Sequence, residues 1–318
     1  MQPAQNETLP PLAPVVAVLL CSYQGERHLA EQLDSIAAQT HRGWTLWVSD
    51  DRSTDGTLAI LEQYRSRWGS DRLSILTGPA RGFAANFRSL TCHAEIDADG
   101  YAWCDQDDVW EPEKLERALA WLQSVPAGTP ALYGSRTLLT DEENRAIGMS
   151  PLFTRPPCFQ NALVQSIAGG NTMVFNRATR DLLIRANGEG EAVAPDWLAY
   201  LLVSSCGGQV RYDPWPSVRY RQHDENLSGS NVSLRGRWQR MRMLLDGQFK
   251  GWVDANVTLL ERVRSRMPEE NLRILDAFVQ ARREPMPARL LGLRRAGVHR
   301  QTAVGTFGLA VAALLNRL

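Results

Sequence analysis

The sequence predicts an α/β protein built on a mostly parallel sheet with helices on both faces. Short apolar runs alternate with helical patterns, and four strand-to-helix units precede residue 125. The first run, residues 15–20, is apolar throughout, as expected for a parallel strand that helices cover on both sides. With 318 residues, the chain is long enough for one large α/β domain or two ordinary ones.

The first two units place polar residues at the ends of apolar strands. The first strand leads into Ser22 and Tyr23, and a helix is expected over residues 29–39. The second strand ends in Asp50 and Asp51, before a helix expected over residues 57–68. Open α/β sheets bind ligands at the carboxyl ends of their strands, so these polar residues are candidates for a binding site.

The third unit carries a loop at residues 78–83, with Arg81 inside it, between a short apolar strand and a helix. Neither Gly-x-Gly-x-x-Gly nor Gly-x-x-x-x-Gly-Lys-Ser/Thr follows any of these strands. A phosphate site made only of backbone amides is therefore not expected, and a metal ion together with arginine should bind the phosphate instead.

The most informative segment is residues 101–110, where Asp105, Asp107 and Asp108 follow a buried strand. Carboxylates next to apolar residues are costly unless a positive partner neutralises them. Mg²⁺ or Mn²⁺ suits such oxygen ligands and leaves its other positions to water and substrate phosphate. The alternative is that Asp107 or Asp108 caps the helix that starts near Pro112. The metal hypothesis predicts a diphosphate substrate.

Two later segments are candidate ligand contacts. Gly169, Gly170 and Asn171 lie between a helix and a strand, and paired glycines let the backbone approach a ligand closely; a plain turn is the alternative. Asp196 precedes a helix expected over residues 197–205, where it could serve in catalysis or simply as an N-cap.

Four motifs, taken in order, resemble glycosyltransferase family 2. They are residues 21–23, 49–57, 82–86 and 105–110. Within that family the chain is most similar to the rhamnosyltransferase-like branch that builds bacterial surface polysaccharides such as O-antigen. That similarity rests on residues 169–176, 195–198 and 220–226.

The resemblance implies a GT-A fold over residues 15–230, with a nucleotide-binding half at about 15–125 and an acceptor half at about 126–230. It also implies an inverting, metal-dependent transfer of a sugar, with rhamnose as the candidate. The donor would be a dTDP- or UDP-linked sugar, and the acceptor a glycan or lipid-linked glycan.

The resemblance also implies roles for individual residues. Asp196 would be the catalytic base, and Asp107 would bind Mn²⁺ or Mg²⁺, with Asp105 and His223 as further candidate ligands; Asp108 would support them or cap a helix. The implied nucleotide contacts are Ser22, Tyr23, Asp50, Asp51, Arg81 and Asp105. The implied contacts to donor sugar or acceptor are Gly169, Gly170, Asn171, Trp197 and Arg221.

Two other functional classes remain open. A phosphatase-like hydrolase also uses an Asp-x-Asp pair, but that pair should follow the first strand, whereas here it follows the fourth. A non-catalytic nucleotide-sugar-binding protein would keep the fold without turnover.

The ends of the chain differ from its centre in composition. Residues 1–14 are expected to be a flexible leader without the apolar core of a signal peptide. Residues 231–318 are expected to form a helical, basic extension. The chain has 35 basic and 35 acidic residues, but from Arg262 onward it has 11 basic and 4 acidic ones. This asymmetry predicts an acidic partner for the extension and argues against nucleic acid as a partner of the whole protein.

Residues 302–315 are apolar but too few to span a bilayer, which needs about 20 residues. Arg294, Arg295 and Arg300 precede them and Arg317 follows, so an amphipathic or hydrophobic hairpin at an anionic membrane surface is expected. Packing on the protein's own domain or a dimer contact is the alternative. The five cysteines form no Cys-x-x-Cys pair, which favours reduced thiols in the cytoplasm. Together these features predict a peripheral protein at the cytoplasmic face of the inner membrane.

Overall fold

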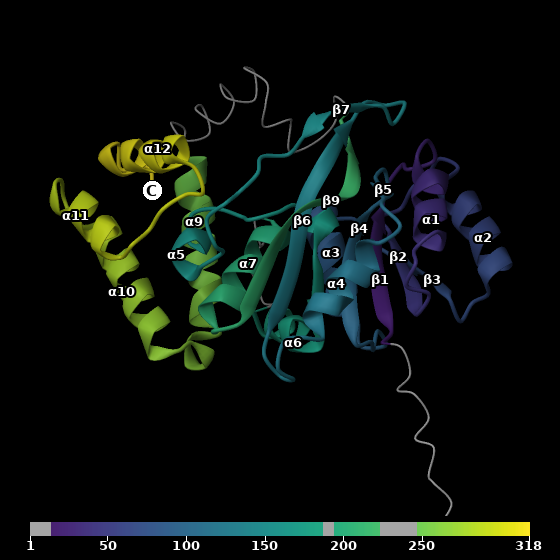
Figure 1. The fold of residues 1–318 in the computed structure, drawn as a ribbon, viewed down its shortest axis with the longest axis horizontal. Helices are drawn as coiled ribbons and strands as arrows, with labels where there is room; N and C mark the ends of the chain where they lie inside the picture. Colours follow the sequence, from purple (N-terminus) through teal and green to yellow (C-terminus); the bar gives the residue numbers. More distant parts are fainter. Residues whose placement is uncertain (1–13, 187–193, 223–246) are drawn as a thin grey trace, which may run out of the picture.

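The computed structural model describes residues 14–186, 194–222 and 247–318. Within them, one mixed sheet is covered by helices on both faces, and a group of helices closes one end (Figure 1). Its strands are β1 Val16–Ser22, β2 Trp44–Asp50, β3 Leu73–Thr77, β4 Gly100–Asp105, β5 Val109–Trp110, β6 Ala131–Thr140, β7 Ala146–Met149, β8 Val174–Asn176 and β9 Gln209–Arg221. The α/β prediction is confirmed.

The helices follow the predicted alternation through the first four units. They are α1 Leu29–Ala37, α2 Thr57–Trp68, α3 Phe83–Thr91, α4 Lys114–Leu122, α5 Phe159–Ala162, α6 Arg177–Ala186, α7 Pro195–Ser205, α9 Gln248–Glu261, α10 Glu269–Arg283, α11 Ala288–Arg295 and α12 Ala303–Leu314, with short 3₁₀ turns η1 Gly170–Thr172 and η2 Arg264–Arg266. The predicted helix at 57–68 has the bounds of α2, whereas α1 ends two residues before the expected position 39.

The sheet changes from parallel to mixed halfway across. Its order is β3-β2-β1-β4-β8-β6-β9-β5, with β7 beside β6. The first four strands are mutually parallel, and β8 then pairs antiparallel to both β4 and β6. β5 pairs with the end of β9, Val109 opposite Arg219. This pairing brings the β4–β5 loop, which carries the acidic residues, beside the end of β9.

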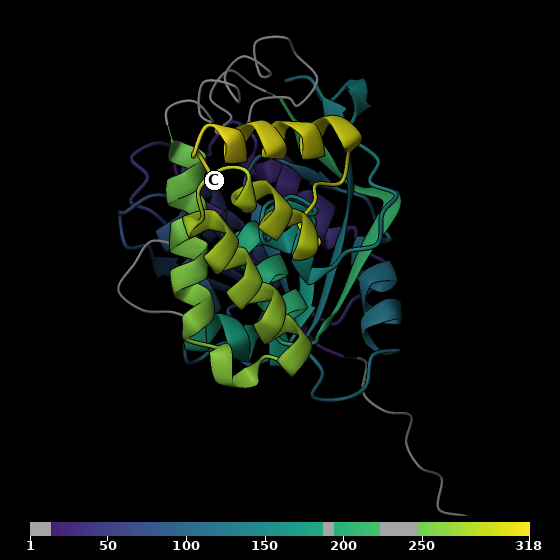
Figure 2. The same cartoon turned by 90° about the vertical axis from the view of Figure 1, so that its left-hand side faces the viewer.

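Two apolar cores lie on opposite faces of the sheet. β1 is buried along its whole length and contributes alternate side chains to each core, as expected for a central parallel strand. One core contains residues of α1, α2 and α4. The other contains residues of α3, α6 and α7 and continues into α9, α10, α11 and α12. The C-terminal helices therefore pack on the α/β part of the chain, and Figure 2 shows them across this end of the molecule.

The loops after β1 and β4 are tied together by one side-chain amide. Gln106 Nε2 donates to the carbonyl oxygen of Tyr23 at 2.8 Å, and the Tyr23 N–H donates to Gln106 Oε1 at 2.8 Å. Gly25 lies so close to this amide that an added Cβ would overlap Gln106 Oε1. A side chain at this position would therefore displace the Gln106 amide from its paired geometry.

Gly25→Ala should lower the free energy of unfolding by about 1–3 kcal/mol, because the methyl group displaces Gln106 and breaks both bonds. Gly251→Ala is the matched control. Nothing lies within 4 Å of a Cβ there, and position 251 is inside α9. This control should gain about 0.5–1 kcal/mol from helix propensity. Urea unfolding measures both, and equal stability of the two variants would contradict the packing argument.

Candidate functional site

The carboxyl ends of three neighbouring strands meet at one edge of the sheet. Ser22 at the end of β1 stands opposite Asp50 of β2, and Cys21 stands opposite Asp105 of β4. In Figure 1 these strands run upward from the N-terminal trace, so their carboxyl ends lie at the top of the view. The structure thus brings together the polar residues that the sequence placed after each strand.

Asp105, the last residue of β4, and Asp108, in the β4–β5 loop, lie in an environment that opposes their ionisation. Removal from water, reinforced by the charge of Asp107, raises the pKa of Asp105 to about 7. Burial likewise raises the pKa of Asp108 well above its ordinary value. Asp108 accepts a hydrogen bond from Asn171 Nδ2 at 2.5 Å, while its buried Oδ1 has no hydrogen-bond partner among the described residues. The loop therefore holds more negative charge than its surroundings neutralise.

This excess of negative charge fits a divalent cation. Among the described residues, no group of three or more His, Cys, Asp or Glu side chains is arranged to hold a metal by itself. Two carboxylates, Asp105 and Asp107, are nevertheless what Mg²⁺ or Mn²⁺ takes from a protein when phosphate and water supply the other ligands. The remaining candidate ligand, His223, lies outside the described residues.

Asp196 faces the same cluster from α7. Its charge contributes to the raised pKa of Asp105, so the two carboxyl groups are close enough to interact. Burial raises the pKa of Asp196 itself, against a hydrogen bond from Ser166 that lowers it. The N-cap of α7 is Ala194, so Asp196 stands inside the first helical turn and is not the capping residue. Likewise α4 has Glu113 as its N-cap, which removes the capping role suggested for Asp107 and Asp108.

The η1 turn lies between Asp196 and the end of the sheet. A Cβ on Gly170 would stand 3.6 Å from Asp196 Cβ and 3.7 Å from Trp103 Cε3. A Cβ on Gly169 would stand 2.7 Å from Asn171 Oδ1. The paired glycines therefore allow the turn to pack tightly against its own Asn171 and beside the candidate base, and whether they also contact a ligand stays a prediction.

Lys114 is a functional candidate that sequence reasoning missed. Its side chain is fully buried, its Nζ lies 3.6 Å from the centre of the Trp110 ring, and it donates to the backbone carbonyl of Asn171. Burial lowers the pKa of Lys114 to about 7, although Cys104 and the carboxyl groups of Asp108 and Asp105 act in the opposite direction. Asn171 thus joins a buried cation to a buried carboxyl group, beneath the acidic loop.

Tyr220 of β9 was also missed. Burial raises the pKa of its phenol first, and the negative charges of four carboxyl groups raise it further. These groups belong to Asp108, Asp105, Asp107 and Asp196. Tyr220 is therefore close enough to all four members of the cluster for each of them to affect its pKa. A sequence signal existed, because Tyr220 belongs to the quoted segment 220–226.

Most of the predicted nucleotide contacts hold loops in place. Ser22 Oγ donates to Asp50 Oδ1 at 2.8 Å, and the Ser53 N–H and hydroxyl also donate to this carboxylate, so the acceptor capacity of Asp50 is largely used. Asp51 accepts from the Ala80 N–H at 2.5 Å and thereby fixes the loop that carries Arg81. Tyr23 is different, because its side chain is 59% exposed and open to a ligand.

Arg221 and Trp197 are buried and bonded to other parts of the protein. Arg221 is 2% exposed; its Nε donates to the backbone carbonyl of Asp107 at 3.0 Å, and NH2 pairs with Glu31 at 2.5 Å. It supports the acidic loop from behind. Trp197 is 7% exposed, donates to the Ala162 carbonyl at 2.7 Å and stacks on Phe249. This arrangement gives no support to the prediction that these two side chains contact the sugar or the acceptor directly.

Lys114→Met should lower the free energy of unfolding by about 3 kcal/mol, because it leaves the buried Asn171 carbonyl and the nearby carboxyl groups without the partner that Lys114 supplies. Its pH dependence has a definite sign. Between pH 7 and 10.5 the unfolded chain holds a proton on Lys114 that the folded protein does not, so wild-type stability gains on the variant as pH rises. Urea unfolding at pH 7 and pH 9 measures the difference. Lys250→Met, the chain's other lysine, should change stability little, and equal losses in both variants would contradict this role.

Solved glycosyltransferase structures share this fold. The structure of S. aureus TarS residues 1–349 superposes on this chain with a TM-score of 0.53 and 15% sequence identity. The match covers 88% of this chain and 89% of the TarS chain. The mannosyltransferase PcManGT from Pyrobaculum calidifontis, solved with GDP-Man and Mn²⁺, matches 96% of this chain and 85% of its own, with a TM-score of 0.50 and 17% identity. At these identities the likeness concerns the fold alone.

Curated relatives and a family model extend the comparison to the sequence. The dTDP-rhamnosyl transferase RfbG of Shigella flexneri is 26% identical over 245 residues, 73% of this chain and 81% of the relative. An uncharacterized glycosyltransferase of Haemophilus influenzae is 26% identical over 227 residues, 68% of each chain. The model described as glycosyl transferase family 2 matches residues 17–183, more than half of the chain. The acidic site therefore lies in a glycosyltransferase, and the chain belongs to glycosyl transferase family 2.

Proposed function

We propose that this enzyme is an inverting, metal-dependent glycosyltransferase that moves a sugar from a nucleoside diphosphate to a glycan acceptor. The observation that carries the proposal is the gathering of Asp105, Asp107 and Asp196 at the carboxyl ends of the sheet, around Tyr220. Structural neighbours solved with UDP-GlcNAc and with GDP-Man and Mn²⁺ support the choice of donor class.

Asp105 and Asp107 are the proposed ligands of Mn²⁺ or Mg²⁺. The Asp108 carboxylate oxygen that has no hydrogen-bond partner in the described parts of the chain and the raised pKa of Asp105 support a cation at this loop. When bound, the ion would neutralise the negative charge that develops on the leaving diphosphate. The protein contributes rigidity, because Arg221 holds the backbone of Asp107 and Asn171 holds Asp108.

Asp196 is the proposed base. As a carboxylate it would take the proton from the acceptor hydroxyl while that oxygen attacks the sugar on the face opposite the diphosphate, which inverts the anomeric centre. The Ser166 hydroxyl orients the carboxylate, and Gly170 leaves space beside it. The Tyr220 phenol, facing the same carboxyl groups, would remain protonated and available as a hydrogen-bond donor to the substrate.

The proposed donor is dTDP-rhamnose, with UDP-linked sugars as the second choice. It is supported by the 26% identity to a relative named as a dTDP-rhamnosyl transferase. The proposed acceptor is a lipid-linked glycan of a bacterial surface polysaccharide. An Asp-x-Asp phosphatase is the weaker alternative, because the acidic loop follows β4 and not the first strand. Release of phosphate from simple monoesters would favour it, and donor binding without turnover would favour a non-catalytic protein.

A second proposed feature is attachment to a membrane surface through α12. No helix in the described parts of the chain is long and apolar enough to cross a membrane. The predicted hairpin is instead one helix. Leu309, Ala312 and Ala313 pack inward, which bears out part of the internal-packing alternative. Val304 and Phe307 are 82% and 72% exposed.

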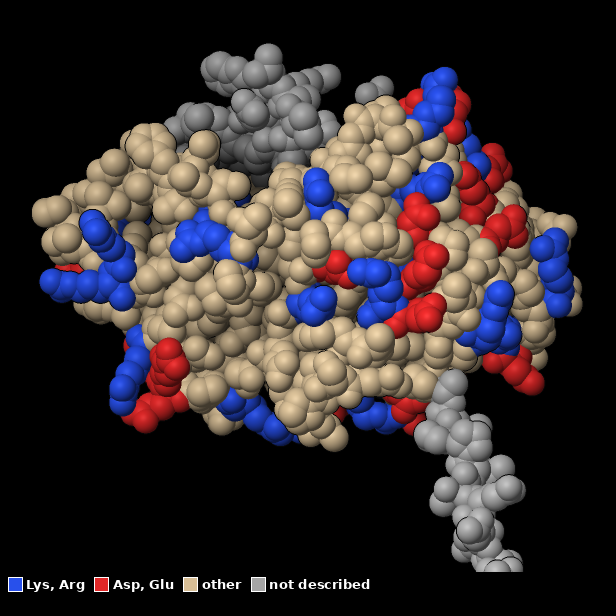
Figure 3. Space-filling view, in the orientation of Figure 1, with Lys and Arg blue, Asp and Glu red and all other residues tan. Residues whose placement is uncertain are grey.

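The exposed side of α12 carries a stripe of apolar side chains that begins with Val304 and Phe307. Leu314 is 51% exposed, and positions 304, 307, 311 and 314 fall on one helical face. Figure 3 shows the area over α12 free of charged residues, with basic residues nearby. An apolar helical face beside arginines such as Arg294 and Arg295 suits the interface of an anionic leaflet. In Figure 1, α12 lies on the side toward which the parallel strands run, so a membrane there would be near the acidic edge.

Donor binding should require both the metal and Asp107. Calorimetry with a panel of nucleotide sugars, with Mn²⁺ and with chelator, should detect thymidine- or uridine-linked donors only when the metal is present. Asp107→Ala should weaken binding to the level seen in chelator, because it removes a proposed ligand. Asp181→Ala, an exposed carboxylate of α6, should bind like wild type. Undiminished binding in chelator would count against the metal role.

Asp196→Asn should lower the rate of transfer by about 10²–10⁴-fold while donor affinity stays within about twofold, because only the proton acceptor is lost. The sign of the pH dependence follows from the need for an ionised base. Wild-type activity should fall as pH drops through the Asp196 pKa, which burial places above 3.8. Steady-state kinetics across pH measures both, with Asp181→Asn as control. Full activity of the Asp196→Asn variant would remove Asp196 from the mechanism.

Replacing both Val304 and Phe307 by Glu should reduce binding to vesicles containing phosphatidylglycerol by about tenfold or more, because two exposed apolar side chains no longer enter the interface. Ile147→Glu with Met149→Glu is the matched control, since these β7 residues are 59% and 44% exposed. Cosedimentation measures the bound fraction. Equal binding by both double variants would exclude α12 as the attachment surface.

A further inference from the structure

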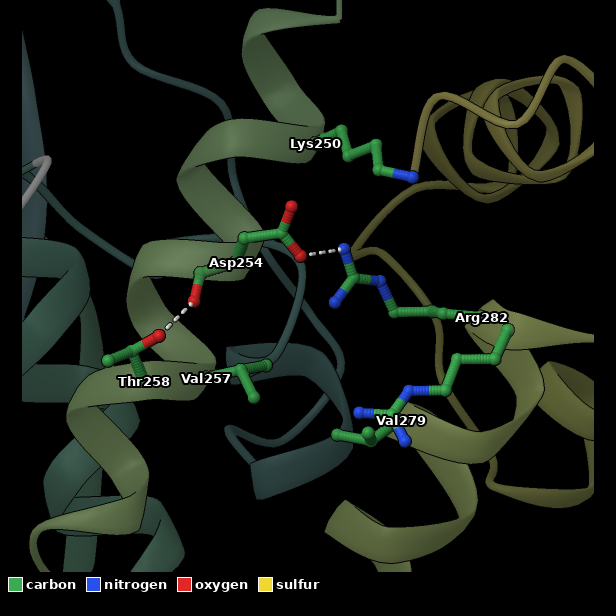
Figure 4. A pocket seen from close by; sticks show the side chains of 7 residues that line it. Lys250, Asp254, Val257, Thr258, Val279 and Arg282 are labelled. Carbon is green, nitrogen blue, oxygen red and sulfur yellow. Dashed lines mark hydrogen bonds and ion pairs between the residues drawn. The ribbon is translucent and has the colours of Figure 1, made fainter.

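A pocket between α9 and α10 lies apart from the acidic site and is used by nothing described above. Its volume is about 240 Å³. Figure 4 shows it from close by, with side chains of both helices converging on one space. The residues lining it are Lys250, Asp254, Val257, Thr258, Val279, Arg282 and Arg283.

Arg282 is a buried cation whose hydrogen-bonding capacity is not filled. Its side chain is only 9% exposed, and NH2 pairs with Asp254 at 2.5 Å. Its carbon Cζ lies 5.5 Å from the centre of the Phe278 ring, which fixes the guanidinium further. The buried Nε has no hydrogen-bond partner within the described parts of the chain. A buried donor without an acceptor costs free energy, so an acceptor from outside would be bound favourably here.

The pocket has three cations and one carboxylate. Asp254 is occupied by Arg282, and no hydrogen bond or ion pair within the described residues neutralises Lys250 or Arg283. Figure 4 shows the charged ends of Lys250 and Arg282 directed toward the space beside Asp254. The carboxylate therefore fixes one cation and leaves the pocket with a net positive charge.

We propose that this pocket binds a phosphate group. Two guanidinium groups and an ammonium group supply several donors to the oxygens of a phosphate, and guanidinium pairs with such oxygens by two parallel bonds. The Thr258 hydroxyl lines the pocket, but its proton is donated to the backbone carbonyl of Asp254 at 3.0 Å, so the cations supply the donors. Val257 and Val279 form an apolar wall that suits an uncharged group attached to the phosphate.

The surroundings of the pocket leave two sources of that phosphate. Lys250 is three residues after Gly247, where an added Cβ would lie 3.0 Å from NH1 of Arg317, the arginine that follows α12. The pocket is therefore near the end of α12. A phosphate carried by a free solute and the phosphate of an anionic lipid headgroup present the same chemistry, so the experiment includes an arm for each.

The first arm titrates inorganic phosphate and pyrophosphate into the full chain by calorimetry, at constant ionic strength and in chelator so that no metal serves the acidic loop. Saturable binding is expected. Lys250→Met with Arg283→Met should weaken it at least tenfold. Asp254→Asn should strengthen it several-fold, because Arg282 is released to the anion. A merely structural role for Asp254 would produce no such gain.

The control variant removes two positive charges at positions outside the pocket. Arg145→Met with Arg273→Met is suitable because both side chains are about three-quarters exposed, at 74% and 76%. It should bind phosphate within twofold of wild type. Because Arg283 is exposed and Lys250 is only partly buried, circular dichroism and thermal unfolding should show their double variant to be folded.

The second arm compares vesicles of phosphatidylcholine with vesicles that also contain phosphatidylglycerol. If the pocket variant loses more vesicle binding than the charge control, a lipid headgroup supplies the phosphate. If only soluble phosphate binding weakens, the source is a solute, and the proposal still holds. Absence of saturable binding to both, or equal behaviour of the pocket variant and the charge control in both arms, overturns it. None of these results depends on sugar transfer, so failure here leaves the proposed function untouched.

Discussion

Mutual repulsion among carboxyl groups at the ends of β4 and α7 is the constraint on which this structure depends. The charges of Asp107 and Asp196 raise the pKa of Asp105, and all four carboxyl groups add to the effect of burial in raising the pKa of Tyr220. Such a group of carboxyl groups is stable only when protons or cations neutralise part of its charge. Lys114 supplies one cation, which donates to the backbone carbonyl of Asn171. A substrate-bound ion would supply a second one. Under the proposed function, the cation that arrives with the substrate would complete this neutralisation.

The rest of the fold holds this loop rigid. Arg221 bonds the backbone of Asp107, and Gln106 joins the loop to the turn after β1. Pairing of β5 with β9 sets the position of the loop along the sheet. A rigid loop cannot relax by moving its carboxylates apart, so their repulsion is relieved by protonation, in line with the raised pKa values of Asp105 and Asp108, or by a bound cation.

The sequence was sufficient to predict the strand-to-helix units and the meeting of polar residues at one edge, because both follow from local periodicity and from the geometry of parallel strands. It could not predict what the side chains there do. Asp50 and Arg221 looked like ligand contacts, yet each is used by neighbours far away in sequence, Ser22 and Glu31. Nothing in the sequence singled out Lys114, because the burial of a lysine depends on partners such as Asn171, 57 positions later. Burial and pairing of this kind are tertiary properties.

The stacking of Trp197 on Phe249 has a mechanical consequence. Trp197 follows Asp196 directly, and Phe249 is the second residue of α9, so the ring contact connects the proposed base to the first turn of the C-terminal helical group. The two rings are 13° from parallel with centres 6.1 Å apart, inside a continuous apolar core. Close-packed side chains transmit displacement because they have no free volume to absorb it. A displacement of α9 would therefore be transmitted through Trp197 to the carboxylate of Asp196, its neighbour in the chain.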